Sequence, residues 1–271
     1  AAAVFAALAF ARRDPGTKPI PARDVLAIAG CACLGIFGNQ VLFLYGLQRT
    51  TAVNATVLVA TIPVFTVLVA IVLRRERAHV LSIVGVVIAF AGVLWLVGGA
   101  AVELGGRGAL GDLLVLLNAL AYAFYLVLVR NLVARHGSVR VVALGFFVGA
   151  LLAIPIGAPS LIAQAPSLSP GTWALVIFIV LVPTVFTYLA NAWALRFATS
   201  SMVAIYIYLQ PVVAAILAWF FLGEIVSSRV LVTAALVFTG IWLVTRRRTP
   251  VPLAPVEGPP PEPSPESAPR A

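Results

Sequence analysis

Two stretches of the chain repeat the same features in the same order, 148 residues apart. Each stretch has a long apolar run with a proline inside it, then a polar turn with a glutamate, then a second apolar run with a glycine. The matched pairs are Leu47 and Leu195, Thr51 and Thr199, Pro63 and Pro211, Glu76 and Glu224, Val84 and Val232, Phe90 and Phe238, and Gly92 and Gly240. Because the pairing needs no gap, we interpret it as an internal duplication with about half of the chain in each copy.

The apolar runs approach the length that a helix needs to cross a bilayer, roughly 20 residues. The chain is 62% hydrophobic and 10% charged, whereas a soluble domain has about 25% charged residues. Only helices and closed barrels span membranes, and these runs are too long and too apolar for barrel strands. The sequence therefore predicts an all-α polytopic membrane protein.

Nine helices are expected from the apolar runs. Their approximate ranges are 1–11, 25–47, 51–73, 79–97, 112–133, 141–162, 172–197, 199–222 and 229–245. Asp112 is the expected N-cap of the fifth helix. The first run is too short to cross a bilayer, so we expect the sequence to begin inside a transmembrane helix.

The duplication divides the chain into two repeats. The second repeat, 112–248, holds five helices, and the first, 1–98, is expected to lack its first helix and part of its second. The sequence then contains about eight full helices and a partial one of a ten-helix architecture. The loop 99–111 separates the repeats, and the proline-rich tail 249–271 is expected to be disordered. Since five is odd, the two repeats must insert with opposite orientations, and inverted repeats build a site between them.

The basic residues alternate between the two sides of this arrangement. With the loop 12–23 placed in the cytoplasm, 15 of the 18 lysines and arginines lie inside, and Arg49, Arg107 and Arg229 lie outside. This distribution agrees with the positive-inside rule and puts the C-terminus in the cytoplasm. The net charge of +9 is spread between apolar runs, so no nucleic-acid partner is expected. The bilayer and a small molecule are the expected partners, and a homodimer stays open.

No catalytic residue, metal site or cofactor is expected. No acid or base lies in the middle of an apolar run, and the sequence has no nucleotide-binding loop and no hydrolase motif. Cys31 and Cys33 lie two residues apart, hence on different faces of a helix, and are expected to pack as small apolar residues. An enzyme is therefore not predicted.

Neutral polar residues inside the runs are the candidates for substrate binding. On three helices they recur at i, i+4 or i+7, so that each set shares one face. The sets are Asn118, Tyr122 and Tyr125; Thr184, Tyr188 and Asn191; and Tyr206 and Gln210; Asn39 and Asn54 are further candidates. An unpaired amide in hydrocarbon costs several kcal/mol, so these side chains should face a wet cavity or, alternatively, bond to one another across helices. The expected substrate is neutral or zwitterionic.

The paired prolines and glutamates are candidate hinges and anchors. Each proline leaves the carbonyl group four residues earlier without its helical donor, so both helices should kink there. A kink fixed by packing is the alternative to a hinge. The glutamates are expected to anchor their turns to arginine or backbone donors. The hinge and structural candidates are Pro63, Pro211, Glu76, Glu224, Gly92 and Gly240.

The duplicated pattern resembles the EamA-type drug/metabolite transporter superfamily. Two Pro…Glu units carry the resemblance, Pro63 with Glu76 and Pro211 with Gly223-Glu224, and each precedes an apolar helix with a glycine. The segments Leu44–Ala52 and Asn191–Ser201 look like the family's short links before the fourth helix of each repeat. The first repeat departs from the pattern, because Arg74-Arg75-Glu76-Arg77 has no glycine before the glutamate.

The resemblance implies ten helices, cytoplasmic termini, a central cavity and transport of small metabolites, amino acids or drugs. The sequence therefore predicts a secondary transporter that works by alternating access of inverted repeats. A passive channel or facilitator is the alternative, and a membrane-embedded enzyme a more distant one. The arginine- and alanine-rich composition favours a bacterial source and the plasma (inner) membrane. The substrate, the direction of transport and the energy coupling stay open.

Overall fold

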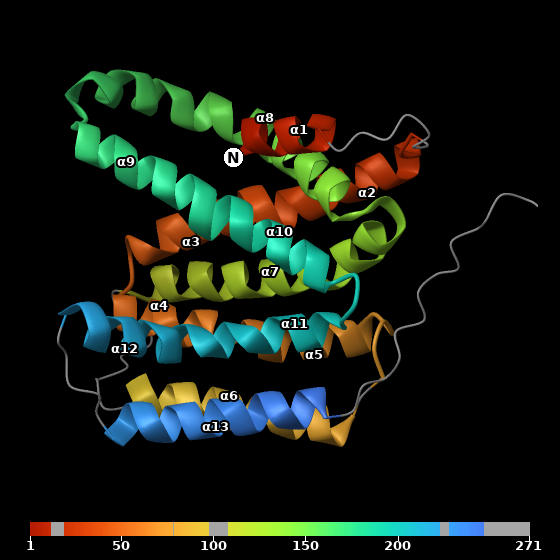
Figure 1. Ribbon diagram of the computed structural model, residues 1–271, viewed down its shortest axis with the longest axis vertical. Helices are drawn as coiled ribbons and strands as arrows, with labels where there is room; N and C mark the ends of the chain where they lie inside the picture. The colour runs from red at the N-terminus through yellow and green to blue at the C-terminus, as the bar shows by residue number, and fades with distance from the viewer. Residues whose placement is uncertain (12–18, 78, 98–107, 223–227, 247–271) are drawn as a thin grey trace, which may run out of the picture.

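The computed structural model describes residues 1–11, 19–77, 79–97, 108–222 and 228–246. Within these ranges the regular structure is helical, and the helices lie side by side in a bundle (Figure 1). Five helical stretches are long and apolar enough to cross a membrane, namely 22–47, 54–72, 109–136, 138–167 and 170–194. The prediction of an all-α polytopic membrane protein is confirmed.

Short π-helical or 3-10 segments, labelled η, interrupt several of the long helices. In chain order the elements are α1 (Ala2–Ala11), α2 (Ala22–Ala32), η1 (Cys33–Gly38), α3 (Asn39–Leu47), α4 (Ala52–Val59), α5 (Ile62–Val72), α6 (Val80–Val97), α7 (Ala109–His136), α8 (Ser138–Gln164), η3 (Ala165–Ser167), α9 (Pro170–Ile179), η4 (Val180–Phe186), α10 (Thr187–Ala194), α11 (Ser200–Ala204), η5 (Ile205–Tyr208), α12 (Leu209–Leu222) and α13 (Ser228–Thr245).

The helices differ from the predicted ranges mainly at their ends. α7 and α8 are longer than predicted, and Gly137 alone joins them. Gly137 has φ of 80°, which glycine adopts without steric cost, so the chain turns within one residue. α7 begins at Ala109, so the prediction of Asp112 as its N-cap is wrong. The predictions for Glu224, the tail 249–271 and most of the loop 99–111 lie outside the described residues.

The duplication is also visible in the backbone. η1 is a π-helix over Cys33–Gly38, and the positions 148 residues later lie within η4, which is also a π-helix. Thr51 and Thr199 cap equivalent helices by accepting hydrogen bonds from the backbone N–H groups of Asn54 (3.1 Å) and Met202 (3.2 Å). The two repeats therefore share local conformation as well as sequence order.

Both proline-containing helices are interrupted just before the proline. In the first repeat α4 ends at Val59 and α5 begins at Ile62, with Pro63 in its first turn. In the second repeat the 3-10 segment η5 separates α11 from α12, which contains Pro211. The missing proline N–H groups explain why regular helix fails at these two equivalent places.

α6 and α13 pack side by side along a seam of small residues (Figure 1). A Cβ atom on Gly85 would lie 2.6 Å from the Gly240 carbonyl oxygen, and Thr233 Oγ1 donates to the Gly92 carbonyl oxygen at 3.0 Å. Gly85 is equivalent to Thr233, and Gly92 to Gly240. Gly85 therefore contacts the residue equivalent to Gly92, and Gly92 contacts the residue equivalent to Gly85. The two helices run antiparallel to each other. This antiparallel exchange is the arrangement that inverted repeats require.

Polar contacts between distant segments gather at one end of the bundle, which we call the arginine-rich end. It is formed by the start of α2 and the turns after α5, α7 and α10 (right side of Figure 1). Asp24 Oδ2 lies 2.6 Å from His136 Nε2 and 3.0 Å from Arg135 Nη1. Arg130 Nε donates to the Ala198 carbonyl oxygen at 3.0 Å. The Asp24 contacts fasten the two repeats to one another, and the Arg130 contact joins two segments of the second repeat.

Glu76 links the two repeats at the same end. Its Oε1 accepts hydrogen bonds from the backbone N–H groups of Ser200 (2.7 Å) and Ser201 (3.3 Å), at the start of α11. The first N–H groups of a helix have no acceptor within the helix, and a carboxylate both satisfies them and complements the helix dipole. The glutamate of the first repeat thus caps a helix of the second.

Replacing Glu76 with alanine is expected to lower the free energy of unfolding by about 1 kcal/mol, the usual contribution of a helix N-cap. Thermal unfolding of the purified protein measures the effect. Arg77→Ala is the control, because Arg77 is exposed in the same turn. Equal melting temperatures for the two variants would show that the Glu76 contacts contribute nothing.

Candidate functional site

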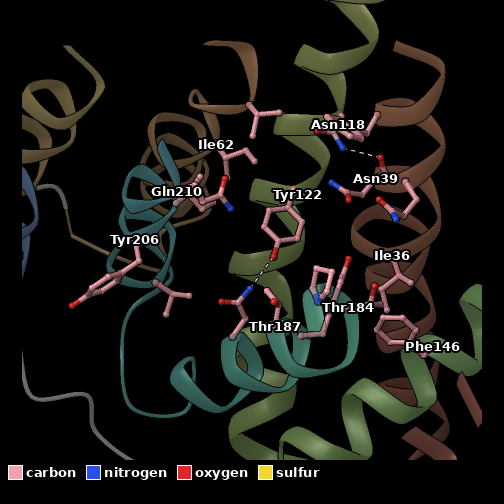
Figure 2. A pocket seen from close by; sticks show the side chains of 18 residues that line it. Ile36, Asn39, Ile62, Asn118, Tyr122, Phe146, Thr184, Thr187, Tyr206 and Gln210 are labelled. Atoms are coloured by element: carbon pink, nitrogen blue, oxygen red, sulfur yellow. Dashed lines mark hydrogen bonds between the residues drawn. The ribbon is translucent and has the colours of Figure 1, made fainter. Parts of the chain in front are cut away.

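A cavity of about 390 Å³ lies in the middle of the bundle, between α3, α5, α7, α10 and α12 (Figure 2). Its size falls within the usual range of small-molecule sites. Its polar lining consists of Asn39, Gln40, Asn118, Tyr122, Thr184, Thr187, Tyr188, Asn191, Tyr206 and Gln210. Among the described lining residues there is no charged side chain. The cavity therefore offers amides, hydroxyl groups and aromatic rings.

The structure brings most of the predicted polar residues together. Those that line the cavity are Asn39, Asn118, Tyr122, Thr184, Tyr188, Asn191, Tyr206 and Gln210. Tyr206 lies at the rim, 48% exposed, and points away from Tyr122 in Figure 2. The three predicted sets of polar residues thus contribute to one cavity, from α7, from η4 and α10, and from η5 and α12.

Tyr125 and Asn54 lie elsewhere, contrary to the prediction. Tyr125 is 4% exposed and packs behind the cavity, where a Cβ atom on Gly35 would collide with its ring. Asn54 lies near the start of α4, and its Nδ2 donates to Asp112 Oδ1 at 3.3 Å. Thr50 Oγ1 donates to the same oxygen. Both predicted residues therefore have structural contacts in place of a position on the cavity wall.

Equivalent residues of the two repeats line the same cavity. At the constant separation of 148 residues, six pairs have both members in the lining. The pairs are Ile36 and Thr184, Asn39 and Thr187, Gln40 and Tyr188, Phe43 and Asn191, Val59 and Ile207, and Ile62 and Gln210. The cavity therefore lies where equivalent parts of the two repeats meet.

Tyr188 connects the two repeats beside the cavity. Its hydroxyl group donates to the carbonyl oxygen of Gly35 at 2.8 Å. Its ring meets Phe146 edge to face, with 4.9 Å between the centroids. Gly35 belongs to η1, and the absence of a side chain there lets Tyr125 pack directly on the backbone. Tyr188 is thus held by both a hydrogen bond and an aromatic contact.

Two further hydrogen bonds position polar groups at the cavity (dashed lines in Figure 2). Asn118 Nδ2 donates to the Asn39 carbonyl oxygen at 2.7 Å, and Asn191 Nδ2 donates to the Tyr122 hydroxyl oxygen at 3.1 Å. Because the Tyr122 oxygen accepts this bond, its own hydrogen is left to donate. A hydroxyl donor and an amide oxygen therefore lie side by side, suited to a group that both accepts and donates.

The π-helix η4 forms the wall around Pro183. Proline has no N–H group, so the carbonyl of Ile179 loses its helical donor. The hydroxyl group of Thr184 donates to that carbonyl oxygen at 2.9 Å and replaces the lost bond. π-Helical turns occur often at functional sites, and here each repeat contributes one to the cavity wall.

Sequence reasoning missed Thr187 as a lining residue and Phe146 as an apolar part of the wall. The duplication held a signal for Thr187, since Thr187 is equivalent to Asn39. No such signal points to Phe146. Among the described residues no cluster of histidine, cysteine and acidic side chains could hold a metal ion.

Comparison with known proteins gives concordant results. A family model described as "EamA-like transporter family" matches residues 1–98 and 109–246. An "uncharacterized transporter" of Archaeoglobus fulgidus is 30% identical over 226 residues, which are 83% of this chain and 76% of that protein. A "probable terminal-alkyne amino-acid exporter" of Streptantibioticus cattleyicolor is 30% identical over 244 residues, 89% of this chain and 80% of that protein.

A solved crystal structure has a similar fold. Its TM-score with this chain is 0.72 at 22% identity, and the match covers 90% of this chain and 83% of the other. At that level of identity the likeness concerns the fold alone.

Proposed function

This chain belongs to the EamA-like transporter family, and from that premise we propose that it is a secondary transporter that moves a small organic molecule by alternating access. Its family and relatives are those of membrane transporters, not of enzymes. In this proposal the repeats 1–98 and 112–248 move against each other and expose the cavity to one side and then to the other.

The observation that carries the proposal is the position of the cavity between equivalent residues of the two repeats. Val59 and Ile207 both line it, and each lies four residues before a proline that interrupts its helix, Pro63 or Pro211. Inverted-repeat transporters place their sites at discontinuous helices of this kind. We propose that the two interruptions are the hinges of the movement.

The uncharged lining favours a substrate without net charge. A buried ion needs a partner of opposite charge, and the described lining holds none. A zwitterion such as an amino acid has both charges on one molecule and can be held by amides and hydroxyl groups. The name of the Streptantibioticus relative, a probable exporter of terminal-alkyne amino acids, gives independent support for this class. We therefore propose neutral or zwitterionic substrates, with amino acids first.

The arginine-rich end is proposed to face the cytoplasm, because positively charged loops stay on that side. The same rule puts the C-terminus in the cytoplasm. A bacterial plasma membrane is the proposed location.

A flux measurement on the full chain in liposomes separates a transporter from a passive channel. Uptake of a labelled amino acid is expected to saturate with concentration, and preloading the liposomes with unlabelled substrate is expected to accelerate it. A binding site that must change its exposure in each cycle has both properties. Flux that rises in proportion to concentration, with no acceleration, would contradict the proposal. Repeating the assay with a pH gradient decides whether protons are coupled.

A further inference from the structure

A second cavity of about 410 Å³ adjoins the first. Four residues line both cavities and form the boundary between them: Phe43, Val59, Ile207 and Gln210. Beyond this boundary the lining is mainly apolar and includes Leu47, Ala55, Ala60 and Val93. The two spaces are therefore a polar chamber and an apolar chamber that share one wall.

The apolar chamber arises from differences between the repeats. The first repeat has Ala55 and Ala60 where the second has Val203 and Tyr208. Tyr208 is only 1% exposed, and its ring packs toward Phe90 with 6.4 Å between the centroids. The small side chains of Ala55 and Ala60 leave space in the first repeat, and Tyr208 of the second repeat lines the same space.

Three of the equivalent pairs in the lining of the first cavity differ in polarity. Phe43 is equivalent to Asn191, and Ile62 is equivalent to Gln210, so the first repeat places an apolar residue where the second places an amide. Ile36 of the first repeat is likewise apolar, and its equivalent Thr184 is polar. A molecule between the repeats thus meets an apolar surface near Phe43 and amides near Asn191.

We propose that the second cavity is a subsite for an unbranched apolar chain of the substrate, whose polar, net-neutral head occupies the first cavity. This inference rests on the proposed function, because it concerns the same site. An apolar chamber excludes polar groups, which lose their hydrogen bonds to water there, and it favours each methylene that it buries. The substrate class is therefore an amphipathic zwitterion or neutral molecule, with aliphatic amino acids as the members to test.

Binding of a homologous series to the full chain in lipid nanodiscs tests the subsite. The series is alanine, norvaline, norleucine and 2-aminooctanoate, measured by calorimetry. Burial of one methylene contributes about 0.8 kcal/mol, so the dissociation constant is expected to fall about fourfold per added methylene until the chamber is full. Equal affinity along the series, as when lipid fills the chamber, would overturn the proposal, as would no binding at all.

Two variants that fill the apolar chamber sharpen the test. Thr56 and Leu47 line it from different helices, and Thr56→Phe and Leu47→Trp would each take up space in it. Both variants are expected to abolish the gain in affinity with chain length while leaving alanine binding within about twofold, since about 0.4 kcal/mol corresponds to a factor of two. Leu44→Trp is the matched control, because Leu44 lies one turn earlier on α3, is 52% exposed and is not a lining residue of either cavity.

The outcomes keep this inference separate from the proposed function. If both filled variants weaken alanine and 2-aminooctanoate equally, the chamber is an entrance and not a subsite, and the inference is wrong. If the length dependence holds in binding but liposomes show no saturable flux, the transport proposal fails and the subsite stands. Retention of the length dependence in both folded variants would also overturn the inference.

Discussion

Replacing Tyr188 with alanine is expected to lower transport efficiency by about 30-fold or more. Tyr188 joins the repeats beside the cavity through its hydrogen bond to Gly35, and its ring contacts Phe146 of its own repeat. A well-packed aromatic anchor contributes on the order of 2 kcal/mol or more to binding, and each 1.4 kcal/mol is a tenfold change. Initial uptake rates in liposomes, normalised to the inserted protein, measure the loss.

The Tyr188→Phe variant separates the hydroxyl group from the ring. Loss of one hydrogen bond costs about 1 kcal/mol, so a reduction of roughly fivefold is expected. Phe186→Ala is the control, because Phe186 is only two residues away and 68% exposed. Transport by Tyr188→Ala at the rate of this control would show that Tyr188 has no part in the site.

Replacing Gly240 with alanine is expected to lower the free energy of unfolding by about 2–3 kcal/mol, the upper part of the range for overpacking a close contact. The added Cβ atom would collide with the Gly85 carbonyl oxygen and lie 2.7 Å from the Ala89 Cβ atom. Backbone atoms cannot move aside as the end of a flexible side chain can, so α6 and α13 must separate. Thermal unfolding in detergent measures the loss.

Gly157→Ala is the matched control for this effect. A Cβ atom on Gly157 meets nothing within 4 Å, and alanine is the better helix former by about 1 kcal/mol. The control is therefore expected to be neutral or slightly stabilising. Similar melting temperatures for the two variants would show that the seam tolerates a methyl group and that its glycines are not needed for packing.

The helical fold and the duplication could be predicted because the sequence shows both directly. Apolar runs long enough for a bilayer mark the helices, and a constant separation of 148 residues relates Pro63 to Pro211. The π-helical segments could not be predicted in this way. Nothing in the run Cys33–Gly38 differs in polarity from ordinary transmembrane helix, and its equivalence to η4 appears only once the backbone is known.

The sequence predicts which face of each helix the site residues share. It does not predict how far along the helix the cavity extends. The spacing of Asn118, Tyr122 and Tyr125 correctly puts them on one face of α7, yet the cavity ends before Tyr125. Periodicity fixes the angle of a side chain about the axis and says nothing of where another helix closes the space. Asn54 donates a hydrogen bond to Asp112, which lies 58 residues away in the sequence. No local sequence pattern predicts such a contact.

The seam between α6 and α13 has the character of an isologous interface within a single chain. In a true homodimer, a substitution at one position appears on both sides of the axis. Fusion of the two copies removes that constraint, and the two halves of the seam differ. The Gly85 backbone contacts Gly240 directly, whereas the equivalent residue Thr233 donates a hydrogen bond from its hydroxyl group to the Gly92 carbonyl oxygen. One half of the seam can therefore become stronger without the other, so the two repeats need not separate with equal ease.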